Sequence, residues 1–199
     1  MVFPESTLPP ARDRRVRRSR SALIGAVVDL VTERRTAAVS ITDIADAADV
    51  SRQVLYQQFG DLDTLLLEAA LGLARSDLLP KFDDVPEAGV ERDWVLIAVR
   101  HFAEHRVFYR AMLSSSASFA LTKGLSALLL PRNRRALQRS VGGQLDAGAL
   151  DDLATLVTGG VATMINTWVV EDDDPLDPEE FTDRLMRAIS VVSRTDDEV

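Results

Sequence analysis

The sequence predicts an all-α protein of about nine helices, with a small three-helix unit at the N-terminus and a larger helical domain after it. Apolar residues recur along most of the 199-residue chain at the three- and four-residue spacing of a helix face. No stretch of useful length shows the strict alternation of a half-buried strand. Hydrophobic residues make up 46% of the chain, which is enough for a packed core and excludes a disordered polymer.

The first residues divide into an arm and a helix. Residues 1–16 hold three prolines and many charges without an apolar period, so we expect a flexible basic arm there. Residues 17–35 place apolar side chains from Ile24 to Val31 on one stripe, which predicts the first helix. Six arginines lie within residues 12–20, a run that is typical of nucleic-acid binding but also of a solvated tail.

Two short helices joined by a tight turn are predicted for residues 40–59. Ser40 and Asp43 fit the pattern of a capping box, so a helix should begin directly after Ser40. Asp49 suits the turn, because Asp tolerates the left-handed backbone conformation better than most residues. Ser51 can cap the second helix.

The second of these helices has a polar outer face. With Leu55 turned inward, Arg52, Gln53, Tyr56 and Gln57 fall outward. Arg can bond guanine O6 and N7, Gln can pair with adenine N6 and N7, and a Tyr hydroxyl suits a phosphate. This arrangement indicates a helix-turn-helix unit that reads the major groove, although an ordinary helix corner with a polar outside shows the same pattern.

Six further helices are predicted after this unit. Their expected ranges are residues 61–79, 88–105, 107–113, 119–141, 151–170 and 178–192. Pro80 and the stretch Asp83-Asp84-Val85-Pro86 should end the first of them, and Pro131 should kink or interrupt the fourth. Gly142-Gly143 and Gly148 should bracket a loop before the final helical pair.

The net charge of −8 argues against nucleic acid only when the chain is taken as a whole. Residues 1–60 carry nine arginines against seven acids, whereas residues 61–199 carry 14 basic and 24 acidic residues. A basic head on an acidic body is expected of a nucleic-acid binder with a second function elsewhere in the chain. The absence of cysteine excludes disulfides, thiolate metal sites and a cysteine nucleophile.

The sequence gives little support to a membrane or export role. Residues 153–170 carry no charge, but four threonines, two glycines and an asparagine predict a helix inside protein or at a subunit interface. The twin arginines near the start are not followed by the long apolar stretch of an export signal. We therefore expect a soluble, cytoplasmic protein with no membrane partner.

The stretch from Ser40 to Phe59 resembles the N-terminal domain of TetR-family transcriptional regulators. The residues that carry the likeness are Ile44-Ala45, Ala48, Val50-Ser51, Leu55-Tyr56 and Phe59, then Asp61, Asp63 and Leu65-Leu66. The likeness covers about residues 18–70. It implies a DNA-binding domain at residues 17–63, with its motif at residues 40–59, and a ligand-binding and dimerisation domain at residues 64–199.

The resemblance also implies a set of residues at the DNA. They are Ser40, Thr42, Ser51, Arg52, Gln53, Tyr56 and Gln57 of the motif, with Arg17 and Arg18 of the basic run. Four positions depart from the family pattern. Leu62 stands where a phosphate-binding Lys is common, Asp49 and Arg35 stand where Gly is usual, and Gln58 replaces an aromatic residue or His. With fewer phosphate contacts from the core domain, the arm should carry much of the attraction to double-stranded DNA.

An effector site in the C-terminal helices is a further implication of the resemblance. Aromatic and Met side chains suit a lipophilic or drug-like small molecule, and the −10 charge of residues 61–199 favours a cationic or neutral one. The candidates are Trp94, Phe102, Phe108, Tyr109, Met112, Phe119, Met164 and Trp168. The same residues would also serve as ordinary core.

A histidine motif lies in the helix predicted for residues 88–105. His101, Glu104 and His105 fit H-x-x-E-H, and the spacing puts both imidazoles on one helical face. A metal-responsive regulator or a zinc-dependent hydrolase would use such residues. A hydrolase also needs a third protein ligand and a cleft, so we expect no enzyme activity, no metal and no cofactor, with both histidines at the helix surface or in a pocket.

The last two predicted helices, residues 151–170 and 178–192, each carry an apolar stripe. In TetR-like proteins this pair packs against its copy as a four-helix bundle. The resemblance therefore implies a homodimeric repressor on a roughly palindromic operator, released when a small molecule binds.

Overall fold

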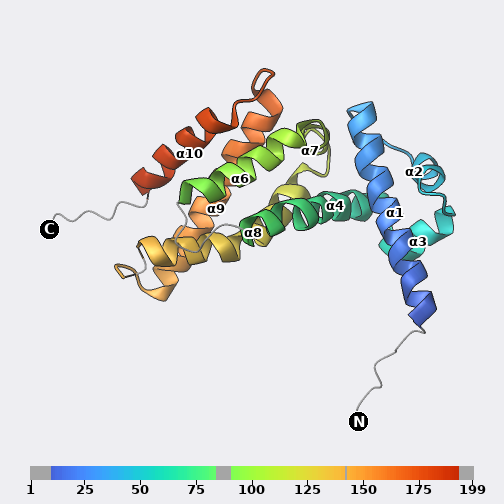
Figure 1. Cartoon of the computed structure of the whole chain (residues 1–199), viewed down its shortest axis with the longest axis horizontal. Coiled ribbons are helices and arrows are strands. Elements are labelled where there is room, and N and C mark those ends of the chain that lie inside the picture. Colours follow the sequence, from blue (N-terminus) through green and yellow to red (C-terminus); the bar gives the residue numbers. More distant parts are fainter. Residues whose placement is uncertain (1–9, 84–90, 142, 193–199) are drawn as a thin grey trace, which may run out of the picture.

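The structure is a computed structural model that describes residues 10–83, 91–141 and 143–192, and this part of the chain is helical without a strand (Figure 1). Its elements are α1 (Pro10–Arg34), α2 (Ile41–Ala47), α3 (Arg52–Phe59), α4 (Leu62–Leu73), the π-helical turn η1 (Ala74–Leu78), α5 (Leu79–Asp83), α6 (Glu91–Glu104), α7 (Arg106–Leu113), α8 (Ser118–Ser140), α9 (Ala147–Glu171) and α10 (Pro178–Val192). Because α4, η1 and α5 run on without a break, the described residues form nine helical rods, as the sequence predicts.

The N-terminal unit consists of α1, α2 and α3, which lie together at one end of the molecule (Figure 1). The first helix begins at Pro10, so the expectation of a flexible arm through residue 16 is wrong for residues 10–16. Pro10 occupies the first position of the helix, where its missing N–H costs no hydrogen bond, and the arginines that follow are good helix formers. The remainder of the predicted arm, residues 1–9, lies outside the described residues.

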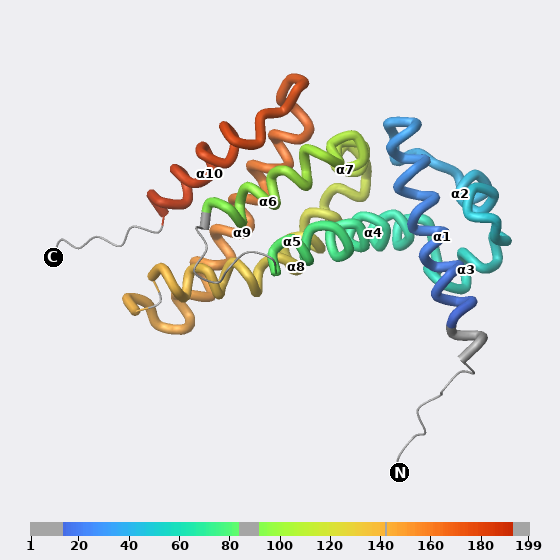
Figure 2. The backbone as a smooth tube through the Cα atoms, in the orientation of Figure 1, coloured from blue at the N-terminus to red at the C-terminus, as the bar shows by residue number. Residues whose placement is uncertain are grey.

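A continuous rod of α4, η1 and α5 runs from the N-terminal unit into the larger domain (Figure 2). The sequence predicts an end at Pro80, but the helix continues to Asp83. Within η1 the N–H of Leu79 bonds the carbonyl of Ala74, five residues earlier. This wider turn directly precedes Pro80, whose ring would press on the carbonyl of residue 76 in a regular helix. The rod therefore passes the proline by widening.

The larger domain packs α6 to α10 around the inner end of this rod. Helix α9 lies along α8 and also contacts α6, α7 and α10, while α10 packs on α6. Helix α8 runs through Pro131 without interruption. Helix α9 begins at Ala147 because the carboxylate of Asp146 caps it at the N–H of Ala149, so Gly148 lies in its first turn and not in a loop as predicted.

One continuous core joins the two parts of the molecule. It includes Leu23 and Val27 of α1, Leu65 of α4 and Met112 of α7, all fully buried. Both α4 and α7 pack on α1, so the N-terminal unit is attached to the larger domain through two separate helices. The position of α1 relative to the larger domain is therefore set by its packing on both helices.

Helix α9 is the single described helix whose length and apolar composition would suffice to cross a membrane. Its inner side is buried in this structure, including Trp168 and Val169, and its exposed side carries Thr155 and Thr163. This pattern is that of a helix packed within protein, as the sequence predicts.

Candidate nucleic-acid interface and ligand sites

Local hydrogen bonds fix the turn between α2 and α3. The hydroxyl of Ser40 accepts the N–H of Asp43 at 3.1 Å, so α2 begins as the capping pattern predicts. Arg34 at the end of α1 donates to the Asp43 carboxylate at 2.5 Å, and hydrogen bonds from Arg34 and Ser40 hold the pKa of Asp43 below its usual range. Asp49 has the expected left-handed conformation, with φ of 51°. Ser51 lies at the start of α3 but makes no side-chain cap bond, contrary to prediction.

Helix α3 turns its apolar side into the core and leaves its polar side in solvent. Leu55 is fully buried and Phe59 nearly so. The residues predicted to face DNA are exposed: Ser40 and Thr42 around the start of α2, and Ser51, Arg52, Gln53, Tyr56 and Gln57 on or just before α3. Tyr56, with 52% of its surface accessible, is one of few large apolar-bodied side chains so exposed. These residues therefore form one polar, solvent-facing surface.

The basic stretch of α1 lies beside α3. Arg20 donates to the backbone carbonyl of Gln58 at 3.4 Å and to the carboxylate of Glu68 at 3.0 Å, which links α1 to α3 and α4. Arg17 and Arg18, which precede it, are exposed. The lower part of α1 thus brings cations to the same end of the molecule as α3 (Figure 1).

An apolar cavity of about 170 Å³ lies in the larger domain between α5, α6, α8, α9 and α10. Trp94 lines it, and the indole N–H of Trp94 is buried without a hydrogen-bond partner among the described residues. Arg132 and Arg139 lie over the Trp94 ring, 5.5 and 4.7 Å from its centroid. The immediate surroundings of this cavity are therefore basic at one side, in contrast to the acidic charge of the domain as a whole.

The other aromatic and Met residues expected at the effector site lie elsewhere. Phe102, Phe108, Tyr109 and Met112 are buried in the main core, and Met164 packs against it. Trp168 stacks on Phe181, with ring centroids 4.3 Å apart. Phe119 is 79% exposed at the start of α8. Of the eight candidates, the structure brings only Trp94 to the cavity wall, because the sequence reveals which residues are apolar but not which of them meet one another.

Comparison with known proteins bears on the helix-turn-helix unit first. The family model of bacterial regulatory proteins of the tetR family matches residues 23–69, which span the second half of α1, all of α2 and α3, and most of α4. This match identifies residues 23–69 as a TetR-type helix-turn-helix domain. The match supports a DNA-binding transcriptional regulator.

Relatives of similar length share the fold of the whole chain. An uncharacterized HTH-type transcriptional regulator of Mycobacterium tuberculosis is 24% identical over 185 residues, which cover 87% of this chain and 75% of the relative. A TetR-family protein from Rhodococcus sp. has a solved structure with a TM-score of 0.61 at 19% identity, covering 89% of this chain and 99% of that one. RolR, solved without ligand, has a TM-score of 0.59 at 23% identity, covering 88% and 97%. These likenesses extend the TetR fold to both domains.

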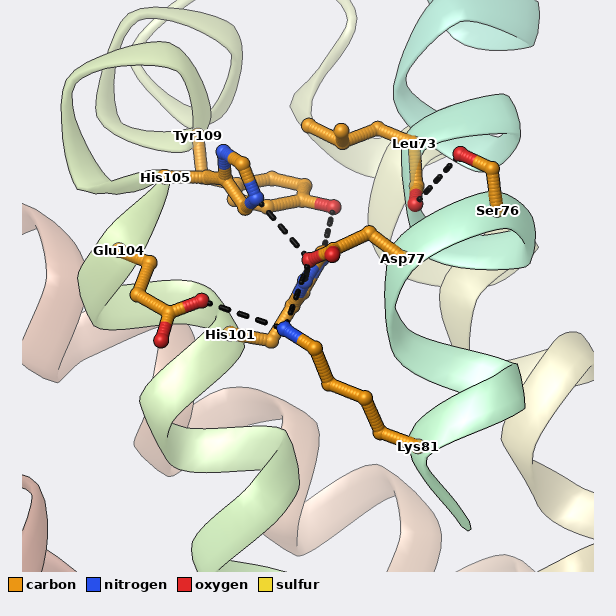
Figure 3. A network of polar contacts seen from close by, with 8 residues as sticks. All are labelled: Leu73, Ser76, Asp77, Lys81, His101, Glu104, His105 and Tyr109. Carbon is orange, nitrogen blue, oxygen red and sulfur yellow. Dashed lines mark hydrogen bonds and ion pairs between the residues drawn. The ribbon is translucent and has the colours of Figure 1, made fainter. Parts of the chain in front are cut away.

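The pair of histidines meets a third residue that the sequence did not suggest. The Oδ2 atom of Asp77, on η1, lies 2.7 Å from His101 Nδ1 and 3.1 Å from His105 Nε2 (Figure 3). The Tyr109 hydroxyl lies 2.9 Å from His101 Nε2, so the fully buried His101 has a partner on each ring nitrogen. Glu104, the third residue of the sequence motif, is exposed and contacts Lys81 instead.

The electrostatics of this cluster follow from its burial and contacts. Burial lowers the pKa of His101 to about 4 and raises the pKa of the Tyr109 hydroxyl. Partial burial opposes ionisation of Asp77, but hydrogen bonds from His101, His105 and Lys81 outweigh it and lower the pKa of Asp77 to about 2. The cluster is thus an ionised carboxylate beside a neutral, buried imidazole. Asp77 escaped sequence reasoning because it is 24 residues before His101 and no local motif marks it.

The last two helices leave a face of small and polar residues in solvent. The exposed residues of α9 are spaced by three and four, and include Thr155, Leu156, Gly159, Gly160 and Thr163. Leu156 is 63% exposed, and Val191 on α10 is 70% exposed. A helix face of this kind allows another helix to approach closely.

Proposed function

We propose that this protein is a homodimeric, ligand-responsive repressor that binds a roughly palindromic operator through α3 of each subunit. The single observation that carries the DNA-binding surface is the polar face of α3, held outward by the burial of Leu55 and Phe59. Arg52 and Gln53 suit base edges in the major groove, and Tyr56 suits a phosphate. Ser40 and Thr42 at the N-terminus of α2 add contacts to the backbone.

The dimer follows from the exposed face of α9 with α10. Gly159 and Gly160 offer no side chain to keep a neighbouring helix away, and Leu156 gives that face an apolar centre. Two copies of the pair would bury these residues in a four-helix bundle with a two-fold axis. Such a dimer places two α3 helices on one side of the DNA, which matches an operator with two-fold symmetry.

The cavity beside Trp94 is the proposed effector site. Its wall is mostly apolar, and an unsatisfied indole N–H offers one hydrogen bond to a lipophilic molecule. Phe82 of α5 is part of this wall, and α5 is continuous with α4. A ligand in the cavity would therefore contact the same rod that packs against the N-terminal unit. An effector that binds one orientation of the rod better shifts the population toward it and lowers operator affinity. The site of action is the cytoplasm, where the operator is accessible.

The experiment begins with the DNA upstream of the protein's own gene. Footprinting should protect a two-fold symmetric sequence, and a gel-shift titration should give its affinity. Arg52→Ala should weaken binding by about ten-fold or more, since a good base contact is worth roughly 1–3 kcal/mol. Tyr56→Ala should also weaken binding, because it removes the proposed phosphate contact. Gln138→Ala, an exposed polar residue on α8, is the matched control and should leave the affinity unchanged.

Other outcomes would contradict particular parts of the proposal. Unchanged binding in folded Arg52→Ala and Tyr56→Ala proteins would remove α3 as the reading surface. Light scattering should show a dimer at micromolar concentration, and Leu156→Asp should shift it toward monomer. If the wild-type protein is a monomer under those conditions, the proposed dimer is wrong.

A further inference from the structure

We propose that Asp77, His101 and His105 form a binding site for a divalent transition-metal ion of the zinc type. The three side chains come from two elements: the π-helical turn η1 supplies Asp77, and the end of α6 with the residue after it supplies the histidines (Figure 3). The site is separate from the Trp94 cavity and goes beyond the regulator proposed above. Its effect on DNA binding, argued last, rests on that proposed function.

The ligand atoms already converge. One atom from each residue, a carboxylate oxygen or a ring nitrogen, lies within 4.8 Å of the other two. The closest separations are 2.7 Å from Asp77 Oδ2 to His101 Nδ1 and 3.1 Å from the same oxygen to His105 Nε2. Ligand atoms at about 2.0–2.1 Å from a tetrahedral zinc ion stand roughly 3.3 Å apart. The separation of Asp77 Oδ2 from His101 Nδ1 would have to widen by roughly 0.6 Å, and the two imidazole nitrogens, which lie within 4.8 Å of each other, would have to adjust to the same spacing to admit the ion.

The donor set suits this class of ion. Two imidazole nitrogens and one carboxylate oxygen are typical ligands of zinc and of neighbouring first-row metals, whereas calcium and magnesium prefer an all-oxygen set. Three protein ligands leave one tetrahedral position open.

Tyr109 orients the buried ligand. Its hydroxyl lies 2.9 Å from His101 Nε2, and the edge-on contact of the two rings, with centroids 5.6 Å apart, fixes the imidazole plane. With metal on Nδ1, the remaining proton is on Nε2 and is donated to the Tyr109 oxygen. Metal-binding histidines commonly have a second partner of this kind on the other ring nitrogen.

Lys81 competes with a metal for Asp77. Its ammonium lies 3.2 Å from Asp77 Oδ2, the same oxygen that both histidines contact, and 3.3 Å from Glu104. The Lys81 ammonium lies in part of the space that a metal ion would occupy. It is itself a cation and is already paired with the Asp77 carboxylate. The Lys81 side chain is 41% exposed and flexible, so it can leave Asp77 while keeping Glu104. Because of this competition, removal of the Lys81 ammonium should increase the affinity for the metal ion.

The π-helical turn supports a functional reading of the cluster. It contains Asp77, and its wider winding changes the direction in which residues of the rod point relative to a regular helix. Such turns are rare and occur frequently at functional sites. The turn that carries the rod past Pro80 thus also contains the carboxylate that meets both histidines.

Metal binding would fix η1 to the end of α6. The rod that contains η1 packs on α1 through α4, so a metal at Asp77 restricts the orientation of the N-terminal unit relative to the larger domain. If the chain acts on DNA as proposed above, operator affinity should then differ between the metal-free and metal-bound protein.

The first measurement needs no DNA. Tag-free, chelator-treated protein is titrated with Zn²⁺ by calorimetry, and with Co²⁺ by visible absorption, which reports coordination geometry. We expect one ion per chain with a Kd of ~1 μM or tighter, and a Co²⁺ spectrum of a four-coordinate site. Failure of the wild-type protein to bind Zn²⁺ at that affinity would overturn the proposal.

Variants separate a metal site from a hydrogen-bonded network. Asp77→Asn and His105→Ala should weaken Zn²⁺ binding by about 100-fold or more, whereas Asp93→Asn, an exposed residue of the same helix α6, should not change it. Lys81→Met should tighten Zn²⁺ binding, because the competing ammonium is gone. Thermal melts of each variant confirm that it is folded. Equal Zn²⁺ affinity in Asp77→Asn and wild type, or weaker affinity in Lys81→Met, would overturn the assignment of these residues.

The effect of the metal on DNA binding is measured separately, on the footprinted operator. Zn²⁺ should change wild-type operator affinity by about five-fold or more and leave Asp77→Asn unaffected. An unchanged operator affinity in protein that demonstrably binds Zn²⁺ would refute the coupling to the N-terminal unit. Loss of all DNA binding with Zn²⁺ binding intact would instead refute the proposed regulator.

Discussion

The guanidinium of Arg20 lies over the ring of Phe59, 4.3 Å from its centroid. Arg20 is on α1 and Phe59 closes α3, and the same guanidinium reaches Glu68 on α4. One side chain therefore joins three helices of the DNA-binding unit. It belongs to the arginine-rich run but points into the protein, unlike the exposed Arg18 two residues earlier. The basic run thus divides into cations that hold the fold and cations that remain available to DNA.

Arg20→Met should destabilise the N-terminal unit. The substitution keeps an unbranched apolar stem over Phe59 but removes the cation–π contact and the hydrogen bonds to Gln58 and Glu68. We expect a loss of about 1 kcal/mol in the free energy of unfolding, because the pair is partly exposed. Urea denaturation measures it, with Arg18→Met as the control. A midpoint equal to wild type would show that Arg20 contributes nothing to the fold.

Arg18→Gln should weaken DNA binding without changing stability. Its side chain is exposed on α1, beside the proposed reading surface. Each lost phosphate contact removes about 0.9 from the slope of log affinity against log salt concentration. Affinities at several salt concentrations, measured on the operator and on unrelated DNA, should fall together for this variant. A slope identical to that of wild type would place Arg18 away from the phosphates.

Arg35→Gly should stabilise the protein. Arg35 follows the end of α1 with φ of 54°, a conformation that costs a residue with a side chain roughly 1–2 kcal/mol. Glycine adopts it freely but loses more entropy on folding, so we expect a net gain of up to about 1 kcal/mol in thermal denaturation. Arg35→Ala removes the same charge and keeps the strain. If the alanine variant gains as much as the glycine variant, charge and not backbone strain is the cause.

Glu179→Gln should reduce stability at neutral pH and have little effect in acid. Glu179 at the start of α10 accepts hydrogen bonds from Arg92 at 2.9 Å and Arg100 at 2.6 Å, both on α6. Hydrogen bonds from Arg92 and then Arg100 lower the pKa of Glu179. A lowered pKa stabilises the fold above the usual value of 4.5, and this contribution is lost as the pH falls through the lowered pKa. Urea midpoints of the two proteins should differ at about pH 7 and converge near pH 3. A constant difference across this range would exclude ionisation as the cause.

The sequence revealed the helix-turn-helix unit well, because its signals are local. A cap at Ser40, an αL-tolerant residue at Asp49 and the spacing of Leu55 and Phe59 each act within a few residues. The start of α1 was harder, since charged arginines lack an apolar period yet are good helix formers. The prediction that the helix ends at Pro80 was wrong because a π-helical turn precedes the proline, and amino-acid composition does not indicate such a turn.

The ligand sites depend on contacts between distant parts of the chain, and here sequence reasoning reached less far. Phe102 and Tyr109 have the apolar character of a pocket wall, but the packing of α6 and α7 buries them in the core. The paired histidines were visible from their spacing, whereas Asp77 meets them only because η1 packs on α6. Periodicity determines which face of a helix is buried and leaves open which partner it meets.

The continuity of α4, η1 and α5 makes this rod a lever. From Asp77 to Leu62 it spans about 22 Å, at roughly 1.5 Å per residue. A tilt of about 10° at the Asp77 end therefore carries the far end through roughly 4 Å, close to the ~3.4 Å separation of successive base pairs. A displacement of a few tenths of an ångström near the fulcrum is magnified along its length. The unbroken backbone from Asp77 to Leu62 thus allows a small displacement in the larger domain to move the N-terminal unit by about one base-pair step.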